Sequence, residues 1–169
     1  MLYTLRRLFK HRWLDESDAR RAVPADMAER LRLRVAASEM RHSGEIRIYV
    51  EAGLPWIYLL RKASARDRAL AVFAKLRVWD TEHNNGVLIY LLLAERAIEL
   101  VADRGLNEVV PSQEWRSMLA RMGAALKEGR HEDGLTQAIA EVSAVLVQHY
   151  ALRAGQGNPN ELPDAPLIG

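Results

Sequence analysis

The segment from residue 79 to residue 93 constrains the fold of this chain more than any other. It begins as a polar loop ending in Asn84-Asn85-Gly86 and passes directly into an apolar run of seven residues, Val87 to Leu93. Such a run lacks polar alternation, which is typical of a strand covered on both faces. It is far shorter than the roughly 20 residues that a membrane-spanning helix needs. The segment therefore predicts a central strand in a helix-flanked sheet.

Two further segments extend this strand into a sheet. Residues 45–51 alternate between apolar and polar side chains and indicate a strand with one wetter face. Residues 97–102 indicate a third strand, and the three residues before it are too few for anything but an antiparallel hairpin with residues 87–93. The sequence therefore predicts three strands, of which the second and third are antiparallel.

The connection between the first two strands contains a helix, predicted over residues 65–78. Ser64 and Asp67, three residues apart, form a capping box at its start. With this helix the connection is long enough for a parallel, right-handed βαβ unit. Residues 52–63 are ambiguous between strand and helix.

Helical spacing of apolar side chains marks the remaining elements. One helix begins at Pro24 and runs to about residue 41, a second begins near Ser112, and a third follows Gly129. The predicted fold class is therefore α/β, a helix-flanked mixed β-sheet with a βαβ unit followed by a β-hairpin and then C-terminal helices.

A chain of 169 residues, 49% of them hydrophobic, has the size of one domain. The expected division is a basic amphipathic segment at residues 1–23, one domain at residues 24–154 and an extended, proline-containing tail at residues 155–169. Trp79 and Trp115 are expected to lie in the core.

The first fourteen residues carry four basic side chains and no acidic one. Read as a helix, residues 1–14 place apolar side chains on one face and Arg6, Arg7 and Lys10 elsewhere. Two interpretations stay open: a terminal helix lying on its own domain, or contact with a membrane surface. The segment has no uninterrupted apolar core of a secretory signal, so the expected location is cytoplasmic, peripheral to the inner membrane if the helix contacts lipid.

Composition limits the chemistry further. The chain has no cysteine, which excludes disulfides, thiolate zinc sites and cysteine nucleophiles. A net charge of +2 without a nucleic-acid-binding motif gives no reason to expect a nucleic-acid partner. No nucleophile and base stand at recognisable spacing, so the sequence identifies no catalytic residue.

The predicted strand directions bring distant turns together. If the first two strands are parallel and the third is antiparallel to the second, then the starts of the first two and the end of the third lie at one edge of the sheet. That edge would gather His42, Glu45, the loop at residues 80–85, and Asp103 with Arg104.

This edge carries candidate ligands for a divalent cation. Calcium and magnesium prefer hard oxygen donors, and five such side chains are expected at the edge: Asp80, Glu82, Asn84, Asn85 and Asp103. His83 and Arg104 are the candidate partners for a phosphate or another ligand. The alternative is a solvated loop in which Asp80 or Thr81 caps a turn and Asn84-Asn85-Gly86 supplies the backbone angles that lead into the strand.

Four motifs in order resemble the TPM-domain family over about residues 35–150. They are His42–Arg47, Trp79–Ile89, Glu95-Arg96 and Asp103–Leu106. This domain occurs in thylakoid lumen phosphatase-like and photosystem II repair proteins. The chain is similar to a short bacterial subgroup without a signal sequence or trailing membrane span, and with a tail like Asn160–Asp164.

The resemblance implies an α/β domain, calcium or magnesium as a cofactor, and an unidentified protein partner. It also implies a binding or accessory role in the assembly, repair or quality control of envelope or membrane proteins. The alternative that it implies is a divalent-metal-dependent phosphatase, in which the cation neutralises a phosphoryl group and activates water.

Overall fold

The computed structural model describes residues 2–153, 155 and 157–169, and only the backbone of residues 2–6. Its helices are α1 (Leu2–Arg12), α2 (Glu16–Ala22), α3 (Ala25–Glu39), α4 (Trp56–Leu60), α5 (Ala65–Lys75), α6 (Arg104–Val109), α7 (Ser112–Lys127) and α8 (His131–Tyr150). Its strands are β1 (Ile46–Glu51), β2 (Val87–Leu92), β3 (Ala97–Ala102) and β4 (Leu167–Ile168), with a short 3-10 turn η1 (Leu93–Glu95) before β3.

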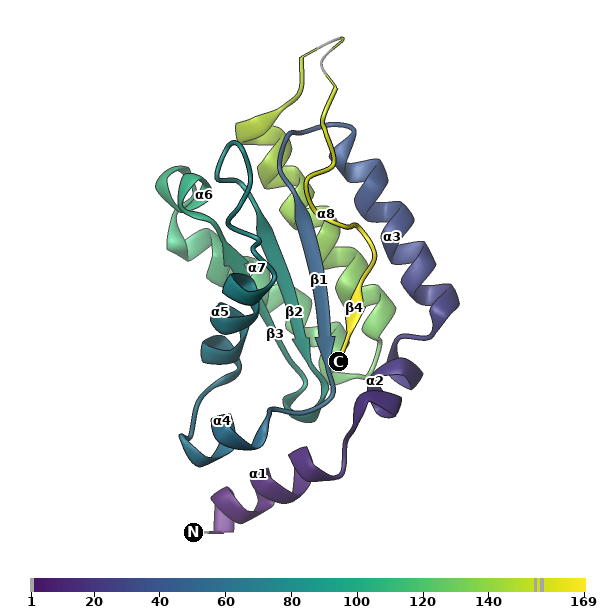
Figure 1. Ribbon diagram of the computed structural model, residues 1–169, viewed down its shortest axis with the longest axis vertical. Coiled ribbons are helices and arrows are strands. Elements are labelled where there is room, and N and C mark those ends of the chain that lie inside the picture. The colour runs from purple at the N-terminus through teal and green to yellow at the C-terminus, as the bar shows by residue number, and fades with distance from the viewer. Residues whose placement is uncertain (1, 154, 156) are drawn as a thin grey trace.

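The strands form one mixed sheet in the order β3-β2-β1-β4 (Figure 1). β1 and β2 are parallel, with Ile46 beside Val87, and β2 and β3 are antiparallel, with Val87 beside Ala102. The predicted parallel pair and hairpin are therefore confirmed. β4 runs parallel to β1 along its other edge, so the extended tail contributes a strand that the sequence did not indicate.

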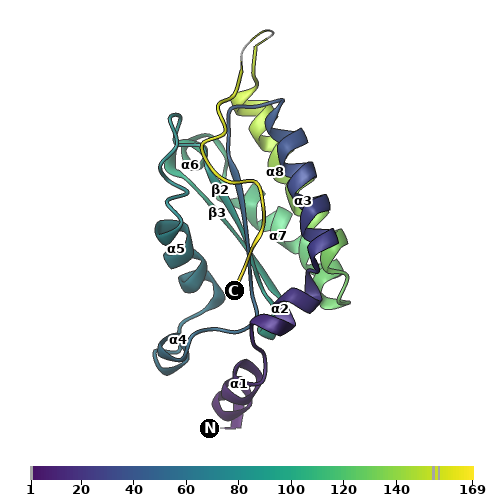
Figure 2. The same ribbon diagram turned by 45° about the vertical axis from the view of Figure 1, so that its right-hand side comes forward.

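Helices cover both faces of this sheet, as Figures 1 and 2 show. α3, α7 and α8 lie on one side and α5 lies on the other. Side chains of β2 alternate between the two layers: Ile89 packs in the core beneath α7 and α8, whereas Leu88 packs in the core beneath α5. Every residue of β2 is buried. The prediction of a strand covered on both faces is confirmed.

The predicted wetter face of β1 is wrong. Glu45, Arg47 and Glu51 are no more than 6% exposed. The reason is that segments distant in sequence supply their partners. Glu51 accepts hydrogen bonds from Arg68 Nε of α5 at 2.9 Å and from the Tyr90 hydroxyl at 2.6 Å. Burying a charge is costly unless it is paired and hydrogen-bonded, and this network ties α5 to the sheet.

The segment between β1 and β2 holds one confirmed prediction and one correction. At the start of α5, Ser64 N–H donates to the Asp67 carboxylate at 2.7 Å and Asp67 N–H donates to Ser64 Oγ at 3.1 Å, so the capping box is present. Trp79 is 46% exposed and lies beside the Arg77 guanidinium, so it is not a core residue. Trp115 is partly buried against the core, as predicted.

The N-terminal region consists of two helices. After α1, Asp15 begins α2 with a second capping box to Asp18, and Ala19 and Val23 enter the main core. Met1 and the side chains of residues 2–6, Arg6 included, lie outside the described part of the chain. Across the residues that are described, no helix combines the length and apolar composition needed to cross a membrane.

Candidate cation site at the sheet rim

Three turns meet at the edge of the sheet where β1 and β2 begin and β3 ends. We call this edge the rim and define it as residues 42–45, 80–86 and 103–105. Backbone hydrogen bonds join its parts: Val87 N–H donates to the Glu45 carbonyl at 2.8 Å, and Asp103 N–H donates to the Gly86 carbonyl at 2.9 Å. The rim therefore assembles as the predicted strand directions require.

Two buried oxygens at the rim lack a hydrogen-bond partner, Asn85 Oδ1 and Asp103 Oδ2. The other polar atoms of both side chains are paired, because Asn85 Nδ2 donates to Ser43 Oγ at 3.2 Å and Asp103 Oδ1 accepts from Arg104 N–H at 2.7 Å. A buried oxygen without a donor loses its hydration with no compensation. Amide and carboxylate oxygens are also donors that calcium and magnesium accept, so these two atoms fit a cation.

The remaining acidic candidates lie on the exposed side of the rim. The Asp80 carboxylate pairs with the Arg77 guanidinium at 2.6 Å, and the Glu82 side chain is 72% exposed with His83 Nδ1 3.9 Å away. Among the residues that the structure describes, no three carboxylate or imidazole side chains converge as a metal-binding group. A cation at the rim would therefore need amide or carbonyl oxygens beside Asp103.

Asn84 and Arg104 connect the loop to the turn after β3. Arg104 Nε donates to Asn84 Oδ1 at 3.0 Å, and Asn84 adopts a positive φ of 52°, a conformation in which asparagine is enriched. Gly105 packs close to this loop: a Cβ atom there would lie 2.6 Å from the Asn84 carbonyl oxygen and 3.0 Å from that of His83. Both carbonyl oxygens thus lie against the turn that carries Asp103.

His42 does not contribute to the exposed surface of the rim. Its ring is buried, with Nε2 2.8 Å from Ser38 Oγ and Nδ1 3.0 Å from the Gly44 carbonyl. Burial lowers the pKa of His42 to about 4, so the imidazole is neutral at pH 7. It holds the turn between α3 and β1 in place.

The C-terminal tail passes along the β1 edge of the sheet in Figure 1 and contacts the rim from that side. Glu82 N–H donates to the Glu161 carboxylate at 3.0 Å, which fixes the loop at residues 80–86. Leu162 N–H donates to the Glu45 carboxylate at 3.0 Å. Arg47 donates to the carbonyls of Pro163 and Ala165. The buried charges of β1 therefore serve to hold the tail.

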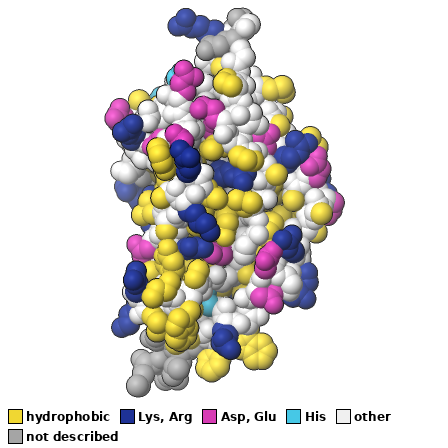
Figure 3. Space-filling model, in the orientation of Figure 1, with side chains coloured by type: hydrophobic (Ala, Val, Ile, Leu, Met, Phe, Trp, Pro, Cys, Tyr) yellow, Lys and Arg dark blue, Asp and Glu magenta, His cyan; other side chains and the backbone are white. Residues whose placement is uncertain are grey.

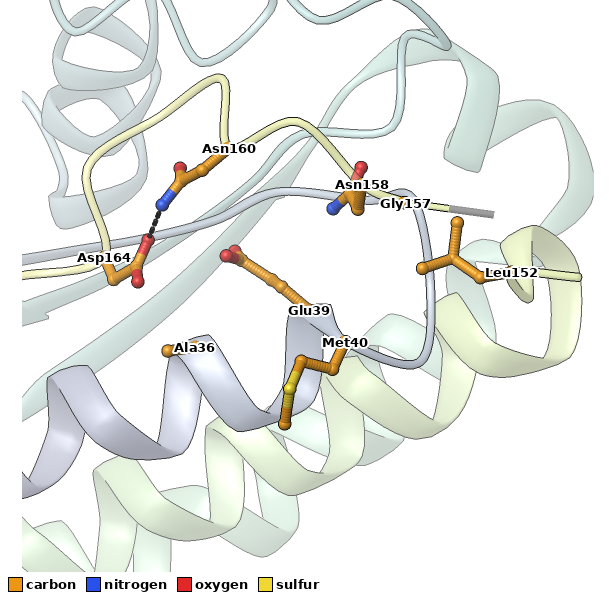
Figure 4. Close-up of a pocket in the computed structure, with 8 residues that line it drawn as sticks. All are labelled: Ala36, Glu39, Met40, Leu152, Gly157, Asn158, Asn160 and Asp164. Carbon is orange, nitrogen blue, oxygen red and sulfur yellow. Dashed lines mark hydrogen bonds between the residues drawn. The ribbon is translucent and has the colours of Figure 1, made fainter. Parts of the chain in front are cut away.

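A hollow of about 410 Å³ lies between the tail and the end of α3 (Figure 4). Asn160 Nδ2 donates to Asp164 Oδ1 at 2.6 Å across the tail turn, and the Glu39 side chain points toward this turn from α3. Glu39 also accepts from Ile46 N–H at 2.8 Å. Burial, together with the carboxylates of Glu45 and Asp164, raises the pKa of Glu39 to about 8.

This raised pKa predicts that the protein loses stability between pH 5 and pH 8. The folded state keeps a proton on Glu39 that the unfolded chain, with a pKa near 4.5, releases, so the free energy of unfolding falls as pH rises across this window. Glu39→Gln keeps an acceptor for Ile46 N–H and removes the charge. We expect it to exceed the wild type in stability at pH 8 by on the order of 2 kcal/mol and to match it at pH 5.

Urea denaturation of both proteins at the two pH values measures this difference. The exposed Glu114→Gln variant is the matched control. Its free energy of unfolding should change with pH as that of the wild type does. If the free energy of unfolding of Glu39→Gln depended on pH as strongly as that of the wild type, the raised pKa of Glu39 would be contradicted.

Sequence reasoning missed the tail residues of the site, above all Glu161 and Leu162. The available signal was the pair of opposite charges, Glu45 and Arg47, on an otherwise apolar strand. Charges on a strand near the centre of a sheet require partners, and the tail's carbonyl and amide groups fill that role.

The fold and the rim define an α/β domain in which a four-stranded mixed sheet presents three loops at one edge. The family profile described as TPM domain matches residues 17–145. The chain belongs to the TPM-domain family, and the resemblance seen in its motifs is confirmed.

Solved structures agree with this assignment. The NMR structure of the BA42 protein from the psychrophilic bacterium Bizionia argentinensis is 25% identical in sequence, with a TM-score of 0.75 over 87% of this chain and 95% of that one. The N-terminal domain of a protein from P. gingivalis is 20% identical, with a TM-score of 0.61 over 76% of this chain and 81% of the other, and shows the shared fold. No curated protein gives a significant match.

Proposed function

We propose that this TPM domain is a binding or accessory module whose rim takes a divalent cation, calcium or magnesium. The observation that carries the proposal is the pair of buried, unpaired oxygens, Asn85 Oδ1 and Asp103 Oδ2, on neighbouring turns of one sheet edge. The carbonyl oxygens of His83 and Asn84 lie beside the same turn. Together they supply oxygen donors but only one carboxylate.

Such a donor set would leave a cation incompletely coordinated. Calcium takes six to eight oxygen ligands, and the remaining positions would be open to water or to an anionic group of a partner. A cation held in this way links two molecules. This supports an accessory role with a protein partner, in the assembly, repair or quality control of envelope or membrane proteins, from the cytoplasmic side of the inner membrane.

The phosphatase alternative uses the same open positions. A cation at the rim would neutralise charge on a phosphoryl group, and the Arg104 guanidinium next to Asp103 could pair with another phosphate oxygen. The binding module is preferred because Arg104 is already bonded to Asn84 and the acid beside it is an N-cap of α6.

Calorimetric titration with calcium chloride and with magnesium chloride tests the cation site. We expect one saturable site with a dissociation constant on the order of 10⁻⁴ to 10⁻³ M, because a single carboxylate gives weak binding. Absence of binding at cation concentrations well above this range would contradict the proposal. Hydrolysis of a generic phosphate ester, measured with either cation, separates the two functions: turnover that Asp103→Ala abolishes would favour the phosphatase.

A further inference from the structure

α1 and α4 lie at the end of the molecule opposite the rim (Figure 1), and exposed hydrophobic side chains are concentrated on and next to them. Of the ten exposed large hydrophobic side chains in the described part of the chain, five belong to this end: Phe9, Trp13, Trp56, Ile57 and Leu60. Trp13 is 81% exposed and Trp56 is 62% exposed. Single exposed apolar residues are common, but a group of them at one place marks an interaction site.

Three of these side chains, Phe9, Trp13 and Trp56, line adjoining hollows. Phe9 and Trp56 line a groove of about 380 Å³ between α1 and α4, and Phe9 and Trp13 line a neighbouring hollow. A third hollow next to the groove reaches Lys62 and shares Leu8 and Leu59 with it. In the space-filling view, hydrophobic and basic side chains lie together at this end (Figure 3). We call it the α1–α4 face.

The α1–α4 face carries positive charge. Lys10, Arg12, Arg61 and Lys62 surround the apolar residues, and none of the four forms an ion pair with any side chain that the structure describes. Glu95, the acid that lines the third hollow, is already paired with Arg7 Nε at 2.7 Å and contacts His11 Nε2 at 3.0 Å. Positive charge around exposed tryptophan suits a surface that is apolar inside and anionic outside.

The two helices are held in a fixed relation. His11 is buried, and its Nδ1 accepts from Leu54 N–H at 2.9 Å in the loop that leads to α4. Arg7 donates to the Ala63 carbonyl at 2.6 Å just beyond α4. Gly53 allows this docking, because a Cβ atom there would lie 2.8 Å from the His11 carbonyl oxygen. Hydrogen bonds and close packing therefore fix α1 against the loop before α4 and the residues after it.

We propose that the α1–α4 face binds the surface of an anionic lipid bilayer, with its tryptophans at the headgroup level. Amphipathic helices that lie on membranes combine aromatic side chains with lysine and arginine in this way, and each basic residue near an anionic surface strengthens the attraction. The sequence indicated residues 1–14 as a membrane contact, and the structure places α4, with Trp56 and its basic neighbours, beside them. The face lies at the far end of the sheet from the rim, so it is independent of the cation site.

Co-sedimentation of the full chain with vesicles tests the proposal. We expect binding to vesicles of phosphatidylglycerol and phosphatidylcholine at low salt, weaker binding as salt rises, and little binding to pure phosphatidylcholine. Failure to bind the anionic vesicles at low salt, as expected if the face instead docks an acidic protein, would overturn the proposal, and so would equal binding to both compositions.

Paired substitutions locate the contact. Trp13→Ala with Trp56→Ala, and separately Arg61→Glu with Lys62→Glu, should each lower the partition coefficient by about tenfold or more. The matched controls, Trp79→Ala and Lys75→Glu, change exposed residues near the other end and should stay within about twofold. All six substituted positions are exposed, so each variant should keep the wild-type thermal melting temperature, which verifies that it is folded. A loss in the controls as large as in the paired variants would overturn the assignment.

Discussion

Replacing Asp103 with asparagine is expected to weaken calcium binding by at least about tenfold and to leave the fold intact. Asp103 supplies the only carboxylate with a buried, unpaired oxygen at the rim, and calcium depends on anionic ligands for its affinity. The same residue is the N-cap of α6, where its Oδ1 accepts from Arg104 N–H at 2.7 Å. Asparagine caps a helix about as well as aspartate, so the substitution removes charge while keeping the cap.

Asp80→Asn is the matched control for this experiment. Asp80 also belongs to the loop, but its carboxylate is paired with Arg77 and half exposed. We expect its calcium affinity to stay within about threefold of the wild type. Calorimetry on the three proteins measures the difference. If Asp103→Asn kept the full calcium affinity and Asp80→Asn lost most of it, the cation would bind on the exposed side of the loop and not at Asp103.

Removing Glu51 is expected to cause the largest loss of stability. The Glu51→Ala variant leaves the buried Tyr90 hydroxyl without its acceptor and Arg68, whose side chain is 14% exposed, without its counter-charge. Breaking a buried pair from one side typically costs about 3–5 kcal/mol. The loss should appear as a lower urea midpoint with an unchanged slope.

A second pair of variants separates lost charge from lost packing. Glu51→Leu with Arg68→Leu removes both charges and should recover most of the loss, since apolar replacements of buried pairs are often neutral. Tyr90→Phe should cost only about 1 kcal/mol. A Glu51→Ala variant within about 1 kcal/mol of the wild type would show that the network contributes little to the stability of the sheet.

The sheet could be predicted because its signals are local. The apolar run of β2, the three residues before β3 and the capping box at Ser64 each depend on neighbours in the sequence. Strand directions then placed the rim without any knowledge of side-chain contacts. β4 escaped prediction because two residues at the edge of a sheet carry no periodic signal.

The partners of polar side chains could not be predicted in the same way. The alternation of β1 indicated a wetter face, yet Glu45 contacts Leu162, 117 residues away, and Arg47 contacts Ala165. Likewise, Asp80 and Asp103 looked equivalent as ligands. Only the structure shows that Asp80 has a local partner in Arg77 and that Asp103 keeps an oxygen without one.

The measurement that tests the rim most directly is a calcium titration of the ¹⁵N-labelled protein followed by NMR. Cation binding between Asn85 and Asp103 predicts saturable shifts in the amide signals of residues 83–86 and 103–105, and none in those of α1 and α4. Unchanged rim signals at saturating calcium, or saturable shifts confined to residues outside the rim, would contradict the account.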